Sequence, residues 1–217
     1  MSHSCTGACG AIATQFDAAR AESDMKQYRT KGPNPTTRLL RDGIVRAGAG
    51  ESLLDIGAGI GAATFELLAA GFSTAFTVDA SSAFVAVARC EAQVRGLASR
   101  MTILEGDFLA TAAAVPAADT VVMDRVVCCY PAYRPLLEQA LKRSDRLFAY
   151  SYPRGRWYVR LVVAWENLWR AVTRNPFRTM VHSPGAMERI LLANGFHRVS
   201  RSGTLAWCVD VYRRGTT

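Results

Sequence analysis

Residues 53–61, Leu53-Leu54-Asp55-Ile56-Gly57-Ala58-Gly59-Ile60-Gly61, carry the strongest structural signal in this chain. An apolar run typical of a buried strand ends at Ile56 and passes through three glycines into a helical pattern. Glycines at these positions let the backbone turn tightly and let a ligand lie against it. The same turn can also join a strand to a helix without any ligand, so its surroundings decide whether it is a binding loop.

Short apolar runs alternate with amphipathic helical patterns from Ser52 onward. Such alternation is typical of units in which parallel strands are buried on both faces. The predicted strands cover residues 52–56, 75–78, 101–104, 120–123 and 146–150, and two more are separated by Ser202-Gly203. The predicted helices cover residues 60–70, 82–96, 133–144, 155–172 and 184–194. We expect an α/β fold with a doubly wound, mainly parallel seven-stranded sheet, ending in an antiparallel hairpin at its edge.

Two segments stand outside this alternation. Residues 1–48 hold two predicted helices, over 11–28 and 36–47, and the second follows Asn34-Pro35, which suit the cap and first positions of a helix. We interpret residues 1–48 as an N-terminal helical lid. Residues 49–217 form the sheet domain, with a helical insert at about 154–182 before the last two strands.

Acidic residues mark three successive predicted strands. Asp55 lies in the first strand, Asp79 ends the second and Asp107 follows the third. Their carboxyl ends form the edge where open α/β sheets bind ligands. With Ala62 the glycines also satisfy the G-x-G-x-x-A pattern of dinucleotide-binding loops, but a carboxylate at Asp55 would oppose a pyrophosphate. S-adenosylmethionine carries a sulfonium and an ammonium and no phosphate, so an acidic residue there suits it.

These motifs, in order over residues 50–150, resemble class I S-adenosylmethionine-dependent methyltransferases. Any one carboxylate could merely cap a helix, but three at successive strand ends are hard to attribute to capping. The resemblance implies S-adenosylmethionine as the cofactor, bound by Tyr28, Asp55, Gly57, Gly59, Gly61, Asp79, Ala80, Asp107, Phe108 and Asp124. A nicotinamide-dependent oxidoreductase is the alternative that fits the glycines but not Asp55.

The loop after the fourth predicted strand, residues 124–131, normally faces the methyl group in such enzymes. It lacks the Asn/Asp-Pro-Pro-Tyr motif common in enzymes that methylate amino groups of bases or amides. We therefore do not expect a nucleic acid as the methyl acceptor. No His occurs in this loop as a general base, and Asp124 is equally suited to line the cofactor.

A narrower resemblance covers roughly residues 125–200. Tyr130-Pro131, the run 147–153 and Val181-His182 are similar in order and spacing to magnesium-protoporphyrin IX O-methyltransferases, which esterify a propionate. The resemblance implies catalytic roles for Tyr130 and His182, although a structural role for His182 is an equal alternative. Cys129 replaces the His that this family carries before the Tyr-Pro pair, so a relative acting on another anionic small molecule is also open.

Positive charge is concentrated in the last third of the chain. Residues 1–141 carry 12 Lys/Arg and 14 Asp/Glu, whereas residues 142–217 carry 14 and 4, giving −2 and +10 and the total of +8. This imbalance favours an anionic small molecule as substrate, and a carboxylate is already a nucleophile at neutral pH. We expect Arg154 and Arg156 to bind its carboxylate and Trp157 to stack on it, with Cys129 nearby. The alternatives are a solvated basic surface or a methyltransferase-like module that binds RNA or lipid.

No apolar run reaches the roughly 18–20 residues that span a bilayer, and the first residues lack the pattern of a secretory signal. We expect a soluble, cytoplasmic protein that contacts at most a membrane surface. Cys5 and Cys9 lack a second Cys/His pair at metal-binding spacing, so no metal is expected. The oligomeric state is not predicted.

Overall fold

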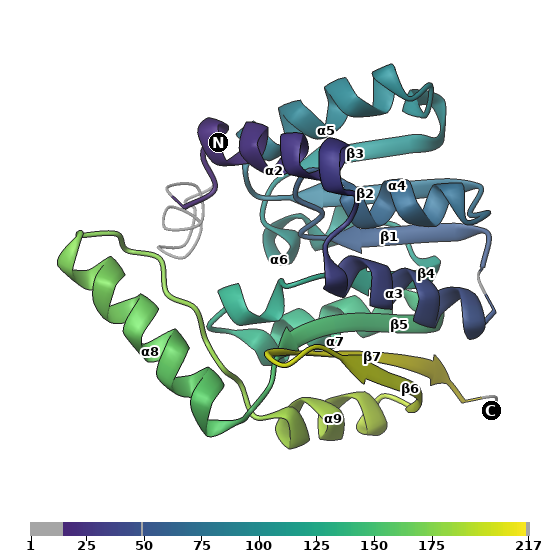
Figure 1. The fold of residues 1–217 in the computed structure, drawn as a ribbon. Helices are drawn as coiled ribbons and strands as arrows, with labels where there is room; N and C mark the ends of the chain where they lie inside the picture. Colours follow the sequence, from purple (N-terminus) through teal and green to yellow (C-terminus); the bar gives the residue numbers. More distant parts are fainter. Residues whose placement is uncertain (1–14, 49, 216–217) are drawn as a thin grey trace.

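The computed structural model describes residues 15–48 and 50–215, and Figure 1 shows its fold. A seven-stranded sheet with the order β3-β2-β1-β4-β5-β7-β6 forms the centre. Its strands are β1 (Ser52–Ile56), β2 (Thr74–Asp79), β3 (Met101–Glu105), β4 (Ala118–Met123), β5 (Ser144–Pro153), β6 (Phe196–Gly203) and β7 (Trp207–Arg214). The first five are parallel and β7 is antiparallel to both neighbours, which confirms the predicted fold class.

Helices cover both faces of this sheet, as a doubly wound fold requires. The helices are α2 (Ala18–Lys31), α3 (Pro35–Arg46), α4 (Ala62–Ala69), α5 (Ser82–Val94), α6 (Phe108–Thr111), α7 (Tyr133–Lys142), α8 (Trp157–Val172) and α9 (Pro184–Ala193), with short 3-10 turns η1 (Ala98–Arg100), η2 (Ala112–Ala114) and η3 (Val127–Cys129). Buried leucines of α7 and α9 pack on one face, and those of α3 and α4 pack on the other. The sheet is therefore buried on both sides.

The terminal hairpin differs from its prediction in one detail. Ser202 and Gly203 belong to β6, and the turn lies at 204–206, so the turn predicted at Ser202-Gly203 is wrong. Thr204 closes the turn, because its N–H donates to the carbonyl of Trp207 (2.9 Å) and its hydroxyl accepts from the Trp207 N–H (3.1 Å). β7 pairs with β5 as far as Pro153, which also extends β5 beyond its predicted end.

The two N-terminal helices play different parts. α3 begins as predicted, with Asn34 Oδ1 accepting from the N–H groups of Thr36 (3.0 Å) and Thr37 (3.2 Å). Its Leu40 and Ile44 are fully buried in the core. α2 begins only at Ala18, later than predicted, because the Asp17 side chain caps it there. It packs over α5.

The insert projects from the rest of the molecule as α8, in the lower left of Figure 1. In α8 only Val159 is buried, and Trp157, Trp165 and Trp169 are 72%, 69% and 62% exposed. These tryptophans therefore do not pack in the core, although their near-helical spacing is compatible with core packing. Within the described part of the chain, no helix combines the length and the apolar character needed to cross a membrane.

Candidate active site

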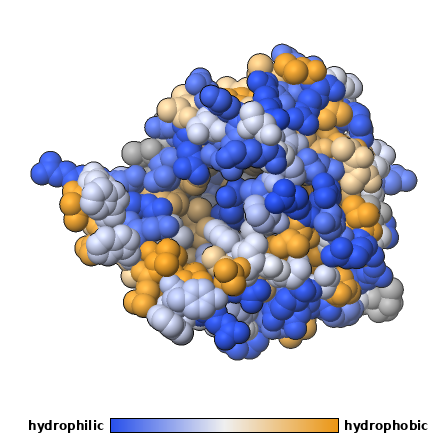
Figure 2. Space-filling model, in the orientation of Figure 1, coloured by the Kyte–Doolittle hydropathy of each residue, from blue (hydrophilic) through white to orange (hydrophobic). Residues whose placement is uncertain are grey.

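A cavity of about 570 Å³ lies at the carboxyl ends of β1, β2 and β4. The sheet forms its floor through the glycine loop and the aspartates that follow the strands. α2 and Phe16 border it on one side, and α8 with the following segment borders it on another. Figure 2 shows the hollow between α8 and the body of the molecule. The topology has thus brought segments from the whole chain to the predicted edge of the sheet.

The glycine loop approaches this cavity as closely as predicted. Gly57 has a φ of 67°, and a Cβ there would lie 2.6 Å from Cγ2 of Val126. Its backbone can therefore turn only without a side chain. Gly59 also lines the cavity, whereas Gly61 does not: it forms the left-handed N-cap of α4 against Phe65. Of the predicted glycines, two face the cavity and Gly61 shapes the turn from behind.

Asp55 is the most deeply buried carboxylate at the cavity, with 1% of its surface exposed. Its Oδ2 accepts one hydrogen bond, from the hydroxyl of Thr64 at 2.7 Å. Burial raises its pKa to about 7, the Thr64 hydrogen bond opposes this, and the charges of Asp124 and Asp79 add to the rise. No cation of the described residues pairs with Asp55, so the site is suited to a positively charged ligand group.

Asp79 links the glycine loop to the second strand. Its Oδ2 accepts from the N–H of Gly59 at 2.7 Å, and its Oδ1 accepts from the N–H of Ser81 at 2.8 Å. Desolvation raises its pKa, and these two hydrogen bonds oppose the rise. Each carboxylate oxygen keeps a second lone pair, so Asp79 can still accept from ribose hydroxyls. Ala80 lines the cavity beside it.

Asp107 combines the two roles considered from the sequence. It caps α6 through its Oδ1, which accepts from the N–H of Leu109 at 3.0 Å, and it lines the cavity. The same Oδ1 accepts a hydrogen bond from the hydroxyl of Tyr130. Phe108 is buried and also reaches the cavity. Tyr130 is thereby tied to the carboxyl end of β3.

Asp124 joins α3 to the sheet. Its Oδ1 accepts from the hydroxyl of Ser151 at 2.6 Å, and its Oδ2 accepts from the hydroxyl of Thr37 at 2.5 Å. The next residue, Arg125, has a φ of 61°, which is costly for a residue with a Cβ. The Ser151 hydroxyl also accepts from the Arg125 N–H at 2.8 Å, which holds this strained turn at the cavity wall.

Tyr28 lines the cavity from α2 but does not point its hydroxyl into it. The hydroxyl donates to Glu66 Oε1 at 3.0 Å, and the ring stacks on Phe65 with 6.2 Å between centroids. Burial raises the pKa of Tyr28, and the Glu66 charge adds to this effect. Phe16 lies deeper over the opening, edge-on to both Phe84 and Phe177 at 5.6 Å. Phe16 was not among the predicted site residues.

The basic side of the cavity comes from residues that the sequence did not single out. Arg20 of α2, Arg125 of the β4 loop and Arg170 of α8 all line it. Arg170 is held in place because its Nη1 donates to Asn167 Oδ1 and Thr179 Oγ1, both at 3.1 Å. The positive φ of Arg125 has no sequence signature. The position of Arg170 could have been found from helical periodicity, because Arg170 and Val159 lie on the same face of α8.

Two adjacent cysteines form the end of the β4 loop within η3. The sulfurs of Cys128 and Cys129 are 3.6 Å apart, and both residues line the cavity. The hydrogen bond with Cys128 lowers the pKa of Cys129, and the nearby Arg125 and Arg170 lower it further. The pKa of Cys128 is raised by this hydrogen bond and by burial. Cys129 is therefore the more readily ionised thiol.

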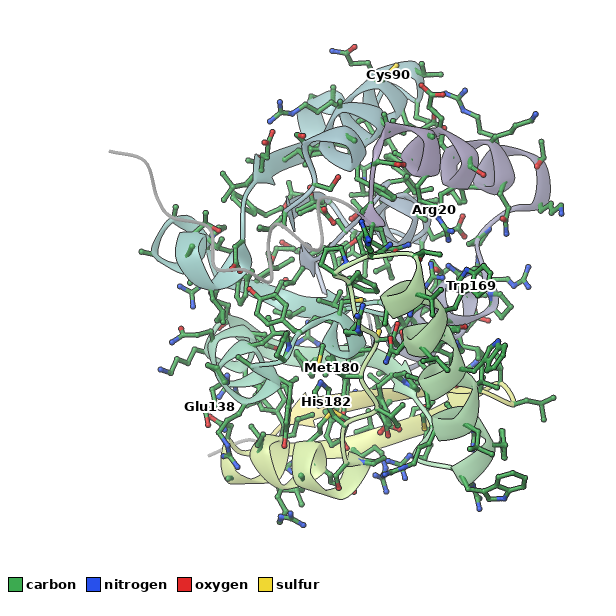
Figure 3. All side chains as sticks on the ribbon, turned by 90° about the vertical axis from the view of Figure 1, so that its left-hand side faces the viewer. Arg20, Cys90, Glu138, Trp169, Met180 and His182 are labelled. Carbon is green, nitrogen blue, oxygen red and sulfur yellow. The ribbon has the colours of Figure 1, made fainter. Side chains whose placement is uncertain are left out.

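His182 does not line the cavity. It lies on the segment between α8 and α9, next to Met180 in Figure 3. Its Nε2 is 3.0 Å from the carbonyl oxygens of both Val127 and Tyr130, and its ring packs on Tyr133 with 4.3 Å between centroids. Burial lowers its pKa, so the imidazole is neutral at neutral pH and donates to these carbonyls. It holds η3 from behind.

The three predicted substrate contacts at the start of the insert also lie off the cavity lining. The Arg154 Nε donates to the carbonyl oxygens of Thr204 (2.8 Å) and Trp207 (3.3 Å), so this side chain ties the insert to the hairpin turn. Arg156 is the exposed residue before α8, and Trp157 is exposed at its first turn. Cys5 and Cys9 lie outside the described residues. Within those residues, no group of three or more His, Cys, Asp or Glu could hold a metal ion.

Comparisons with known proteins agree with this geometry. The family model described as a methyltransferase domain matches residues 53–149. A search of curated proteins finds no match. The magnesium protoporphyrin IX methyltransferase of Synechocystis PCC 6803 with bound SAH has a similar structure, with a TM-score of 0.75 and 18% identity, covering 94% of this chain and 98% of that chain. With bound SAM the same enzyme has a TM-score of 0.73 and 17% identity, covering 99% and 100%.

A further solved structure is that of an O-methyltransferase family protein from Burkholderia thailandensis, with a TM-score of 0.69 and 15% identity, covering 93% of this chain and 61% of that chain. At these identities the similarity concerns the fold, whereas the family match covers the glycine loop and the strands that line the cavity. Residues 53–149 therefore match a methyltransferase domain, and the chain shares its fold with solved methyltransferases.

Proposed function

We propose that this enzyme transfers a methyl group from S-adenosylmethionine to an oxygen of an anionic small molecule, a carboxylate above all. The observation that carries the proposal is a row of carboxylates at the strand ends together with the partly exposed guanidinium of Arg125 in the same cavity. Asp55, Asp79, Asp107 and Asp124 line the cavity at the strand ends, and Arg125 lines it with a partly exposed side chain, whereas the lining arginines Arg20 and Arg170 pair with Asp24 (3.0 Å) and Glu166 (3.3 Å). A cationic cofactor and an anionic acceptor would each meet opposite charge.

The sheet side fits S-adenosylmethionine in the chemistry of its residues. Asp79 has free lone pairs for ribose hydroxyls, Phe108 offers an apolar contact for adenine, and Asp55 is an uncompensated carboxylate suited to a cationic group. The same Asp55 disfavours the phosphates of a nicotinamide dinucleotide. When bound, S-adenosylmethionine supplies an electrophilic methyl group on its sulfonium.

The opposite side suits a carboxylate. Arg125 is 46% exposed at its side chain, and its nearest acid in the described chain, Asp124 Oδ1, is 4.0 Å away, so its guanidinium can take a bidentate ligand. Arg170 also lines the cavity, where it pairs with Glu166 Oε2 at 3.3 Å. A carboxylate is already a nucleophile at neutral pH, so these residues need only bind and align it. That requirement agrees with a neutral His182 that lies outside the cavity lining.

The narrower proposal is that the acceptor is a flat, cyclic acid such as a tetrapyrrole. The similarity to magnesium protoporphyrin IX methyltransferase supports it, and the apolar side chains of α8 that line the cavity, Tyr158, Val159, Val162 and Val163, suit a ring face. Cys128 and Cys129 would border this acceptor. Tyr130 would position the acceptor side against the cofactor side through its bond to Asp107.

The test uses methyl-labelled S-adenosylmethionine with magnesium protoporphyrin IX and a panel of other carboxylic acids, amines and RNA. We expect label in a base-labile ester, and kcat/KM for the ester-forming acid should fall about ten- to a hundredfold in Arg125→Gln. Arg156→Gln is the matched control, because that arginine is exposed and off the cavity lining. Label only in amines or RNA would refute oxygen transfer, and equal losses in both variants would refute the role of Arg125.

A further inference from the structure

One face of α8 is apolar and exposed over most of its area. At about 100° per residue, eight side chains fall within about 140° of the helix circumference, with no charged residue among them. This outer face consists of Trp157, Tyr158, Leu161, Val162, Trp165, Leu168, Trp169 and Val172, and all eight are exposed. In Figure 3 Trp169 points away from the body of the molecule, and Figure 2 shows hydrophobic residues gathered over the same region.

The exposure is not a sign of a detached helix. The opposite face of α8 is tied down by Val159, which is buried, and by Asn167, whose side chain donates to the Thr179 carbonyl at 2.8 Å and accepts from the Thr179 N–H at 2.9 Å. At the other end of the helix, the Tyr158 hydroxyl donates to the carbonyl of Leu205 at 2.8 Å. Leu205 is itself 86% exposed and extends the apolar surface onto the hairpin turn.

Positive charge surrounds this face. Residues 154–178 contain six arginines and one acidic residue, Glu166, which gives a net charge of +5. Four of the six are exposed at the two ends of the helix, namely Arg156, Arg160, Arg174 and Arg178. Exposed tryptophans on an apolar helix face, flanked by arginines, match the interface of an anionic bilayer, where indole rings lie at headgroup depth and guanidinium groups meet lipid phosphates.

A second copy of this chain fits the same face less well. A two-fold interface would place each insert, with its charge of +5, against the identical insert of the partner. Like charges in such an interface repel, whereas anionic lipid neutralises them. We therefore propose that the outer face of α8 docks the enzyme on a membrane surface rich in anionic lipid, lying in the interface without crossing the bilayer.

The docking face and the active-site cavity share a border. Tyr158 and Val162 are exposed on the outer face and also line the cavity, so the cavity opens beside the docking surface. A docked enzyme would present this opening at the lipid headgroups. In a consequence that rests on the proposed function, the acceptor would be an amphiphilic acid drawn from the membrane interface.

Cosedimentation with vesicles tests the proposal. Vesicles of phosphatidylcholine with phosphatidylglycerol, and of phosphatidylcholine alone, are mixed with the full chain at low and moderate salt. We expect stronger binding to the anionic vesicles, weakened by salt but not abolished. Trp165→Gln/Trp169→Gln should bind about tenfold or more weakly, because both indoles leave the interface. Val94→Gln is the matched control, since Val94 is 70% exposed on α5, and should change binding by less than about twofold.

The charge contribution has its own pair of variants. Arg160→Gln should weaken binding to anionic vesicles about fivefold at low salt, whereas Arg134→Gln, at an exposed position on α7, should not. Circular dichroism checks that every variant is folded, and Leu161→Gln replaces the double tryptophan variant if that one is not. Absence of binding to anionic vesicles, or binding unchanged in the tryptophan and Leu161 variants, would overturn the proposal.

Sedimentation equilibrium without vesicles covers the remaining outcome. A stable dimer that Trp165→Gln/Trp169→Gln dissociates would assign the outer face to a second copy and would also overturn membrane docking. Turnover of methyl-labelled S-adenosylmethionine with the panel of acceptors, in the absence of vesicles, is measured separately. A failure of the proposed methyl transfer would be visible there, and it is independent of whether α8 binds lipid.

Discussion

The buried carboxylate of Asp55 makes the sharpest prediction about stability and pH. Its pKa is about 7 in the folded chain, against about 3.9 in an unfolded chain. Between these values the folded protein binds the proton and the unfolded chain does not, so this group's contribution to stability falls as pH rises through the window and is unfavourable above pH 7. The two pKa values differ by about three, and each pKa unit corresponds to about 1.4 kcal/mol, so the free energy of unfolding changes by about 4 kcal/mol.

Asp55→Asn removes this charge and keeps an acceptor for the Thr64 hydroxyl. A neutral acceptor bonds more weakly than a charged one by about 1 kcal/mol, so the expected net gain at pH 8.5 is about 3 kcal/mol. Near pH 4 the gain should vanish, because the wild-type carboxyl is then protonated in the fold. The same substitution should weaken binding of S-adenosylmethionine, since it removes the uncompensated negative charge.

Urea unfolding of the ligand-free protein at several pH values between 4 and 9 measures the difference. Asp119→Asn is the control, and its change in stability should have the opposite sign. The N–H of Ser52 and, to a smaller extent, that of Glu51 donate to the Asp119 carboxylate and hold its pKa below its usual value. That variant should lose stability above pH 4 and approach wild type as the carboxylate is protonated. A loss of stability in Asp55→Asn at pH 8.5, or a gain that is equal at all pH values, would refute the account of Asp55.

Three further predictions concern the cavity walls. His182→Ala should cost about 1–3 kcal/mol of stability and lower kcat, since the carbonyls of Val127 and Tyr130 lose their donor. His182→Asn should recover part of the stability and of kcat. Full activity in the alanine variant would show that η3 needs no support from His182. Maleimide should label Cys129 before Cys128, and bound S-adenosylhomocysteine should slow this labelling. Peptide mass spectrometry identifies the labelled residue. Preferential labelling of Cys128 would contradict the assignment of Cys129 as the more readily ionised thiol. Phe16→Ala should raise the KM of the acceptor more than it lowers Tm, because Phe16 bridges Phe84 and Phe177 across the opening; a large drop in Tm with unchanged kinetics would make Phe16 a core residue instead.

The glycine loop and the aspartates at the strand ends could be identified from sequence because their chemistry is local. A positive φ at Gly57 and a carboxylate directly after a strand depend on neighbours within a few residues. Parallel strands then bring their ends to one edge, so Asp55, Asp79 and Asp107 had to lie together once the alternation was recognised. The fold class and the cofactor side followed from these two facts.

The acceptor side depended on contacts between distant segments, which no local pattern records. Arg154 and Arg156 follow β5 directly, yet pairing of β5 with β7 carries the chain past the cavity, and Arg154 instead binds the hairpin turn. Arg125 and Arg170 both line the cavity, although one follows β4 and the other lies on α8.

His182 shows the same limit. It lies 52 residues beyond Tyr130 in the sequence, and the segment after α8 returns it to the back of η3. The exposure of the outer face of α8 could also be learned only from the tertiary structure. A row of tryptophans at helical spacing has the same sequence pattern whether it faces a core or a bilayer. Sequence determined which residues lie at the sheet edge, since the pattern of each strand and the chemistry of the turn after it are local. Packing alone decided which side chains close the cavity and which remain outside it.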